Sequence, residues 1–168
     1  MEAYSSVWNL IQVHAFSPIM GQYNMEPVIP MQHGLSKPSW TCIHFVDTEQ
    51  SRLICRIRLP SEILLLEANV GEAGSVTDLI SAVSQAMEFP SYFGNSWDAL
   101  EKCLRDMAWL PAEGYVLLLH GAGKFWATAT KVAGALVESW LPCAEEWATI
   151  GVAFHLVFDM GETSNDSH

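Results

Sequence analysis

Three short apolar runs, separated by segments with helical spacing, constrain the fold of this chain more than any other feature. The runs cover residues 63–68, 115–120 and 154–158. Short continuous apolar runs are typical of strands that are covered on both faces, as in parallel sheets. Strands that alternate with helices are joined by right-handed crossovers, which bring them side by side. The pattern therefore predicts an α/β fold with a small parallel sheet.

The segments between these runs have apolar residues at the spacing of amphipathic helices. Ser75 stands before the first of them and is expected to be its N-cap. Pro142 is expected to break the last, because proline lacks the backbone N–H that a helix interior needs. The predicted helices cover residues 76–87, 96–108, 125–141 and 143–149.

The first sixty residues follow a different pattern. Four prolines and two glycines over residues 17–39 are incompatible with a long helix there. Two short runs follow, at residues 40–46 and 53–59, and the second alternates apolar residues with arginine, as a strand with one polar face does. We predict a hairpin over about residues 40–59. The expected organisation is a β-rich extension (1–60), an α/β domain (61–160) and a flexible tail (161–168).

The excess of negative charge is confined to the second part of the chain. Residues 1–60 contain four acidic and four basic residues, whereas residues 61–168 contain fifteen acidic and four basic ones, which accounts for the whole net charge of −11. Nucleic acid is then a poor partner, since its binding depends on Lys and Arg that neutralise phosphates. A basic protein is a plausible partner, because complementary charges steer association. The alternative is that the acidity only keeps the protein soluble.

Compartment and redox state are inferred from what the sequence lacks. No apolar stretch has the length of a membrane helix, and the first basic residue is Lys37, so the chain does not start like a secretory signal. The four cysteines have neither metal-ligand spacing nor the density of a disulfide framework. We expect a cytoplasmic protein with no membrane attachment and four free thiols: Cys42, Cys55, Cys103 and Cys143.

The sequence contains no recognisable catalytic or metal-binding motif. Residues 121–124 follow a predicted strand but lack the first glycine and the Ser or Thr of a P-loop. The six histidines do not have metal-ligand spacing. His120 and His155 lie in or at the ends of predicted strands, where a structural role is favoured over catalysis. We therefore expect no enzyme activity, no cofactor and no metal.

Residues 90–104, Pro-Ser-Tyr-Phe-Gly-Asn-Ser-Trp-Asp-Ala-Leu-Glu-Lys-Cys-Leu, form the most distinctive segment. Asn95 or Ser96 can cap a helix, and Asp98 then lies in the first turn, where the helix dipole favours its charge. The apolar stripe consists of Leu100, Cys103, Leu104 and Met107, so the outward positions are Asp98, Glu101, Lys102 and Arg105. From the residues alone, Asp98 could simply stabilise the helix, and the aromatic side chains could belong to the core.

This segment closely resembles the signature of the barstar family, the intracellular inhibitors of secreted ribonucleases of the barnase type. The resemblance lies in the run Pro-x-Tyr-Phe-Gly…Trp-Asp-Ala-Leu…Cys-Leu and extends over roughly residues 61–160. It implies a three-stranded parallel sheet packed with helices. It also implies an inhibitor whose second helix and preceding loop occlude a ribonuclease active site. The implied partner is a basic secreted nuclease or polymorphic toxin.

The resemblance also suggests which residues meet the partner. Tyr92 matches an interface tyrosine, Asp98 an interface acid, and Glu146 falls near another. The expected partner-binding residues are Tyr92, Phe93, Gly94, Asn95, Asp98, Glu101, Lys102 and Glu146. One position departs from the family, because Lys102 stands where the chief inhibitory aspartate is expected.

The departure at Lys102 leaves two interpretations open. Glu101, next to it, replaces the missing contact, or the partner is not a barnase-like nuclease. The alternative function is a non-inhibitory interaction or scaffold module on the same fold.

Overall fold

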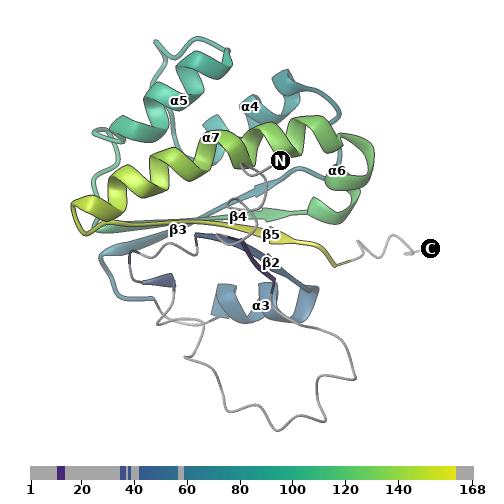
Figure 1. The fold of residues 1–168 in the computed structure, drawn as a ribbon, viewed down its shortest axis with the longest axis horizontal. Coiled ribbons are helices and arrows are strands. Elements are labelled where there is room, and N and C mark those ends of the chain that lie inside the picture. The colour runs from purple at the N-terminus through teal and green to yellow at the C-terminus, as the bar shows by residue number, and fades with distance from the viewer. Residues whose placement is uncertain (1–10, 14–34, 37, 39–41, 57–58, 162–168) are drawn as a thin grey trace, which may run out of the picture.

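Five parallel strands form a single sheet in the order β1-β2-β5-β4-β3 (Figure 1). This computed structural model describes residues 11–13, 35–36, 38, 42–56 and 59–161. The strands are β1 (Ile11–Val13), β2 (Ile43–Val46), β3 (Ile63–Asn69), β4 (Gly114–His120) and β5 (Ala153–Asp159). The helices are α3 (Thr48–Arg56), α4 (Val76–Ala86), α5 (Trp97–Asp106), α6 (Ala122–Thr128) and α7 (Thr130–Thr149). The predicted α/β fold with a parallel sheet is confirmed.

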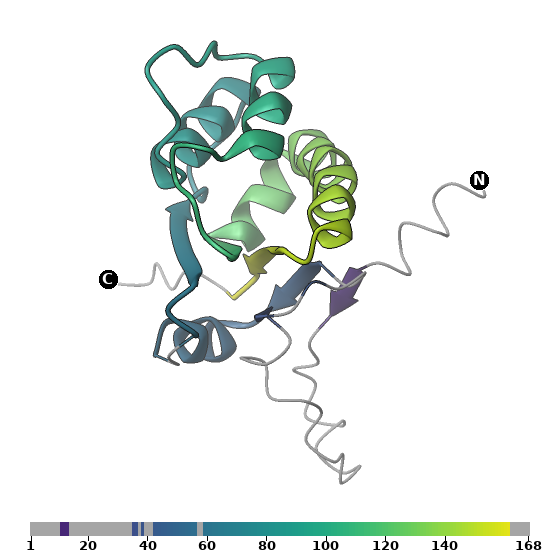
Figure 2. The same ribbon diagram turned by 90° about the vertical axis from the view of Figure 1, so that its left-hand side faces the viewer.

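The direction in which the chain crosses the sheet explains why both faces carry helices. From β3 through β4 to β5 the chain moves one strand at a time, and helices α4 to α7 cover one face. From β2 it moves the opposite way, past β5 and β4, to reach β3, and α3 lies on the other face (Figure 2). Since parallel crossovers are right-handed, reversing the direction of travel puts the crossover on the opposite face.

Each face of the sheet has its own apolar core. On the side of α7, the Trp140 ring stacks on Phe154 with centroids 4.3 Å apart, and Trp140 Nε1 donates a hydrogen bond of 3.2 Å to the Phe154 carbonyl oxygen. On the side of α3, the core consists of Leu35, Val46, Ile54, Val116, Leu118 and Val157. The strands that the family resemblance implies are β3, β4 and β5, and β2 and β1 extend the sheet beyond β5.

The predicted hairpin over residues 40–59 is wrong. Residues 43–46 do form a strand, but β2 pairs in parallel with β5. The second half of the predicted hairpin is instead the helix α3, which buries Ser51 and Ile54 and leaves Leu53 half exposed. Residues 40–41 and 57–58 lie outside the described residues.

The capping of α3 explains why this segment is helical. The Asp47 carboxylate accepts a hydrogen bond of 2.8 Å from the Gln50 backbone N–H, and the Gln50 side chain accepts one of 3.1 Å from the Asp47 N–H. These reciprocal bonds form a capping box, which satisfies backbone donors that a helix start leaves free. The residues between the two predicted strands of the hairpin are therefore the start of a helix.

Helix α7 continues through Pro142, where a break was predicted. Pro142 is exposed, so the Glu138 carbonyl, which loses its usual donor, can face water. The actual interruption lies at Ala129, whose backbone (φ −130°, ψ 50°) separates α6 from α7. The predicted cap of α4 is confirmed, because the Ser75 side chain accepts a hydrogen bond from the Asp78 N–H.

The division into residues 1–60, 61–160 and 161–168 stays a prediction, and all of the tail except Gly161 lies outside the described residues. Among the helices that the structure describes, none combines the length and the apolar character needed to cross a bilayer.

Replacing Ile54 by Ala should destabilise the fold, because Ile54 is fully buried between α3 and the sheet. We expect a loss of about 2–4 kcal/mol in the free energy of unfolding, measured by urea denaturation. Leu53→Ala is the matched control, since Leu53 adjoins Ile54 in the same helix but is 50% exposed. Equal effects of the two substitutions would contradict the placement of α3.

Thiol labelling should separate the four cysteines, which are all free. Cys42, Cys103 and Cys143 are buried, whereas Cys55 is exposed, so a reagent reaches Cys55 most easily. We expect alkylation to modify Cys55 first in the native protein and all four cysteines after denaturation without reductant. Mass spectrometry counts the adducts, and fewer than four in the denatured sample would reveal a disulfide.

Candidate functional site

Helix α5 is fixed at both ends by local interactions. The Ser96 hydroxyl oxygen accepts a hydrogen bond of 3.1 Å from the Ala99 N–H, so Ser96, rather than Asn95, is the N-cap. Met107 ends the helix in the left-handed conformation (φ 46°), and its N–H donates to the Cys103 carbonyl. The inward residues Leu100, Cys103, Leu104 and Met107 are all buried. The predicted buried stripe of this helix is confirmed.

Helices α5 and α7 lie side by side (Figure 1), and polar contacts join them. The Trp147 ring N–H donates to the Leu104 carbonyl oxygen at 2.8 Å. The Ser139 hydroxyl donates to Glu101 Oε1 at 2.9 Å. Glu101 is half-buried between the helices, so its carboxylate is already used within the chain.

Arg105 completes the contact between the two helices. Its Nε donates a hydrogen bond of 2.8 Å to Glu146 Oε2, and its Nη1 lies 4.0 Å from Glu101 Oε2. The hydrogen bond to Glu146 raises the pKa of Arg105. Arg105 thus brings together two of the predicted interface acids, a role that sequence analysis did not find because Glu146 lies 41 positions away.

The predicted interface residues differ in how freely they meet solvent. Tyr92, at 78% exposure, is one of the few large apolar side chains that are exposed among the described residues. Phe93 is half-buried and packs edge-on against Phe89, with ring centroids 4.8 Å apart, so it anchors the loop before α5. The exposed members of the predicted set are Tyr92, Gly94, Asn95, Asp98, Lys102 and Glu146.

Asp98 and Lys102 form an ion pair one turn apart on the outer surface of α5. Asp98 Oδ2 lies 3.1 Å from Lys102 Nζ, and the side chains are 78% and 77% exposed. Exposed ion pairs of this kind contribute little to the stability of the fold, because water screens both charges. The surroundings remain acidic, since α5 and residues 138–149 of α7 together contain six acidic and two basic residues.

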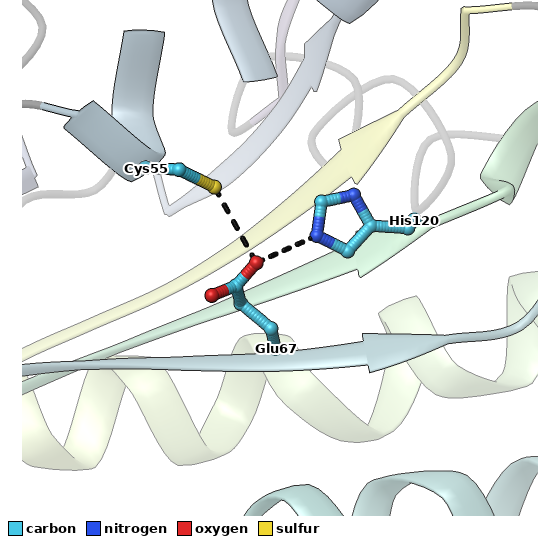
Figure 3. A group of neighbouring side chains, drawn as sticks. All are labelled: Cys55, Glu67 and His120. Atoms are coloured by element: carbon cyan, nitrogen blue, oxygen red, sulfur yellow. Dashed lines mark hydrogen bonds and ion pairs between the residues drawn. The ribbon is translucent and has the colours of Figure 1, made fainter. Parts of the chain in front are cut away.

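A polar cluster that sequence analysis missed lies on the other face of the sheet, at the carboxyl ends of the strands (Figure 3). Glu67 Oε1 lies 2.8 Å from His120 Nε2 and accepts a hydrogen bond of 3.4 Å from Cys55 Sγ in the last turn of α3. His120 Nδ1 lies 3.6 Å from Asp159 Oδ2. Strand alternation explains the meeting, because Ile63, Leu65, Val116, Leu118 and Val157 point to the same face. The members are far apart in sequence, so no local spacing reveals them.

The pKa shifts in this cluster favour the charged forms of His120, Glu67 and Asp159 and the neutral form of the Cys55 thiol. Contact with Asp159 raises the pKa of His120, and the hydrogen bond to Glu67 adds to this, although burial opposes it. The hydrogen bond with His120 lowers the pKa of Glu67. Burial alone would raise the pKa of Asp159, but its contact with His120 and its other hydrogen bonds lower it. Burial, followed by the neighbouring Glu67, raises the pKa of Cys55 to about 11.

His155 is placed as a structural residue. It is buried in β5, and its Nδ1 lies 2.9 Å from Nε2 of His44 in β2. This contact joins two neighbouring strands, which agrees with the structural role favoured for His155.

The α/β part of the chain matches a known protein family. The sequence model of the family described as Barstar (barnase inhibitor) matches residues 63–159. A search of curated proteins finds no significant match. The matched residues run from the first residue of β3 to the last residue of β5, so β1, β2 and α3 lie outside them. Since the match covers more than half of the 168 residues, the chain belongs to the barstar family.

Proposed function

We propose that this protein is an inhibitor that binds a basic toxin, most simply a secreted ribonuclease of the barnase type. Helix α5 and the loop before it would occlude the active site, so the function needs no catalytic residue and no cofactor. The observation that carries the proposal is a pair of exposed side chains, Tyr92 in the loop before α5 and Asp98 in the first turn of α5, a helix held from behind by α7. We also propose that it acts in the cytoplasm, with its thiols reduced.

The chemistry of the surface suits a site that binds phosphate. A ribonuclease active site carries cationic side chains for the phosphates of its substrate, and a carboxylate can take their place. The acidic residues of α5 and α7 would attract such a site over a distance and speed association. Tyr92 adds rigid aromatic area of the kind that dominates binding energy. Because α5 is already ordered, little conformational entropy is lost on binding.

The ion pair with Lys102 does not prevent Asp98 from meeting a partner. An exposed pair is worth at most about 1 kcal/mol, so a cation of the partner can displace Lys102 at small cost. Glu101, by contrast, is held by Ser139 and lies near Arg105, and using it would disturb the contact between α5 and α7. The proposed contact therefore centres on Asp98, and Lys102 is the residue that opposes it.

One observation favours the alternative of a scaffold module with a different partner. Lys102 places a positive charge within 3.1 Å of the carboxylate that would meet a cationic active site. A partner with an acidic residue at that point would fit this surface better. The two candidates predict opposite effects of reversing the charge at Lys102.

Asp98→Asn should weaken binding to a barnase-type ribonuclease, because it removes the charge and preserves the shape. We expect a loss of about 2–5 kcal/mol, mainly through faster dissociation, measured by surface plasmon resonance and by inhibition of RNA cleavage. Glu49→Gln is the matched control, since it removes an exposed first-turn acid from α3 on the opposite face of the sheet. Unchanged binding by both variants would remove α5 from the interface.

Lys102→Asp should strengthen binding to the same ribonuclease, because it replaces a repulsive charge by an attractive one. The gain should be larger at low ionic strength, where charges are less screened. Arg52→Asp, an equal change of charge on α3, should leave the affinity nearly unaltered. Weaker binding by Lys102→Asp would indicate an acidic partner group and would favour the scaffold alternative.

A further inference from the structure

The polar cluster on the α3 face brings three different ligand types to one point. Cys55 comes from α3, Glu67 from β3 and His120 from β4, and Figure 3 shows the thiol and the imidazole both directed at one carboxylate oxygen. The three ligand atoms all lie within 4.8 Å of one another. The cluster lies at the carboxyl ends of parallel strands, which is where α/β sheets commonly bind ligands. It is on the opposite face of the sheet from α5, so a ligand bound there is independent of the proposed function.

We propose that Cys55 Sγ, Glu67 Oε1 and His120 Nε2 form a binding site for Zn²⁺, with a fourth position open to solvent. Thiolate, imidazole and carboxylate are the ligands that Zn²⁺ takes in proteins, whereas Mg²⁺ and Ca²⁺ take oxygen atoms. Cys55 and Glu67 are exposed and His120 is half-buried, so an ion can reach all three from solvent.

The distances require only a small rearrangement. Ligand atoms around a tetrahedral Zn²⁺ lie about 3.3–3.7 Å from one another, given the usual bond lengths. Cys55 Sγ is already 3.4 Å from Glu67 Oε1, and His120 Nε2, at 2.8 Å from that oxygen, would move outward by less than about 1 Å. The sulfur and the ring nitrogen lie within 4.8 Å of each other and would approach by at most about 1.5 Å. The ion would replace the protons of these two hydrogen bonds, and both the Cys55 Sγ proton and the His120 Nε2 proton would pass to solvent.

Asp159 supplies the outer contact that zinc-binding histidines usually have. A histidine that binds zinc through one ring nitrogen commonly has a carboxylate at the other, which fixes the ring orientation. Asp159 Oδ2 lies 3.6 Å from His120 Nδ1, and Asp159 Oδ1 is itself held by a hydrogen bond of 3.0 Å from the Gly161 N–H. Asp159 is therefore a positioning residue for His120.

The site depends on a segment that the family match does not include. Glu67 and His120 lie within residues 63–159, but Cys55 lies outside them. Only the crossover of α3 beneath the sheet brings a thiol to the two other ligands. A bound ion would therefore join α3 to β3 and β4.

The test uses the full chain after dialysis against EDTA, titrated with zinc chloride in a calorimeter. We expect one Zn²⁺ per chain, and a loss of affinity of at least about 100-fold in both Cys55→Ser and His120→Gln. Asp159→Asn should lose about 10–100-fold. Cys103→Ser is the control, because it removes a thiol outside the cluster, and circular dichroism checks that each variant is folded.

Two further measurements report on ligation by the thiolate. Co²⁺ should give a sulfur-to-metal charge-transfer band in the near ultraviolet that Cys55→Ser lacks and Cys103→Ser retains. In the unaltered protein, Zn²⁺ should slow alkylation of Cys55, and EDTA should restore it. The proposal is overturned if the parent binds no Zn²⁺, or if Cys55→Ser and His120→Gln both bind it as tightly as the parent.

Discussion

The burial of β4 and β5 on both faces is the constraint on which the rest of the structure depends. Val116, Leu118 and Val157 point to one side, and Leu117, Leu119 and Leu156 to the other, and all six are fully buried. Strands of this kind require cover on two sides. Helices α4 to α7 cover one side, so the other needs α3, which the reversed crossover from β2 supplies. The segment before residue 63 thus completes the core that the family domain begins.

The parallel sheet could be predicted from the sequence because continuous apolar runs and amphipathic segments are strong local signals. The helix α3 could not, because its alternation of apolar residues with arginine also fits a strand. The signal that decides in favour of a helix is Asp47 followed three positions later by Gln50, whose side chains cap the helix start. Pro142 was expected to break the last helix, but the helix continues through it. A proline on an exposed helix surface leaves one carbonyl without its donor, and water can satisfy that carbonyl.

The candidate interface and the polar cluster differ in how far sequence can reveal them. The outward positions of α5 follow from helical spacing within ten residues, and the buried stripe is where spacing predicted it. The contacts of Arg105 with Glu146 and of Glu67 with His120 join positions 41 and 53 apart. Such contacts depend on strand order and helix packing, so they become visible only in the folded chain.

The anchoring of α5 from behind bears on how such a protein changes over evolutionary time. Its folding is secured by Leu100, Leu104 and the Trp147 contact, none of which faces outward. Asp98 and Lys102 contribute little to that stability, so mutations there are nearly neutral for folding. If α5 binds a target as proposed, lineages could exchange one target for another through single charge substitutions without loss of the fold, and the pair Asp98–Lys102 has the form that such an exchange would leave.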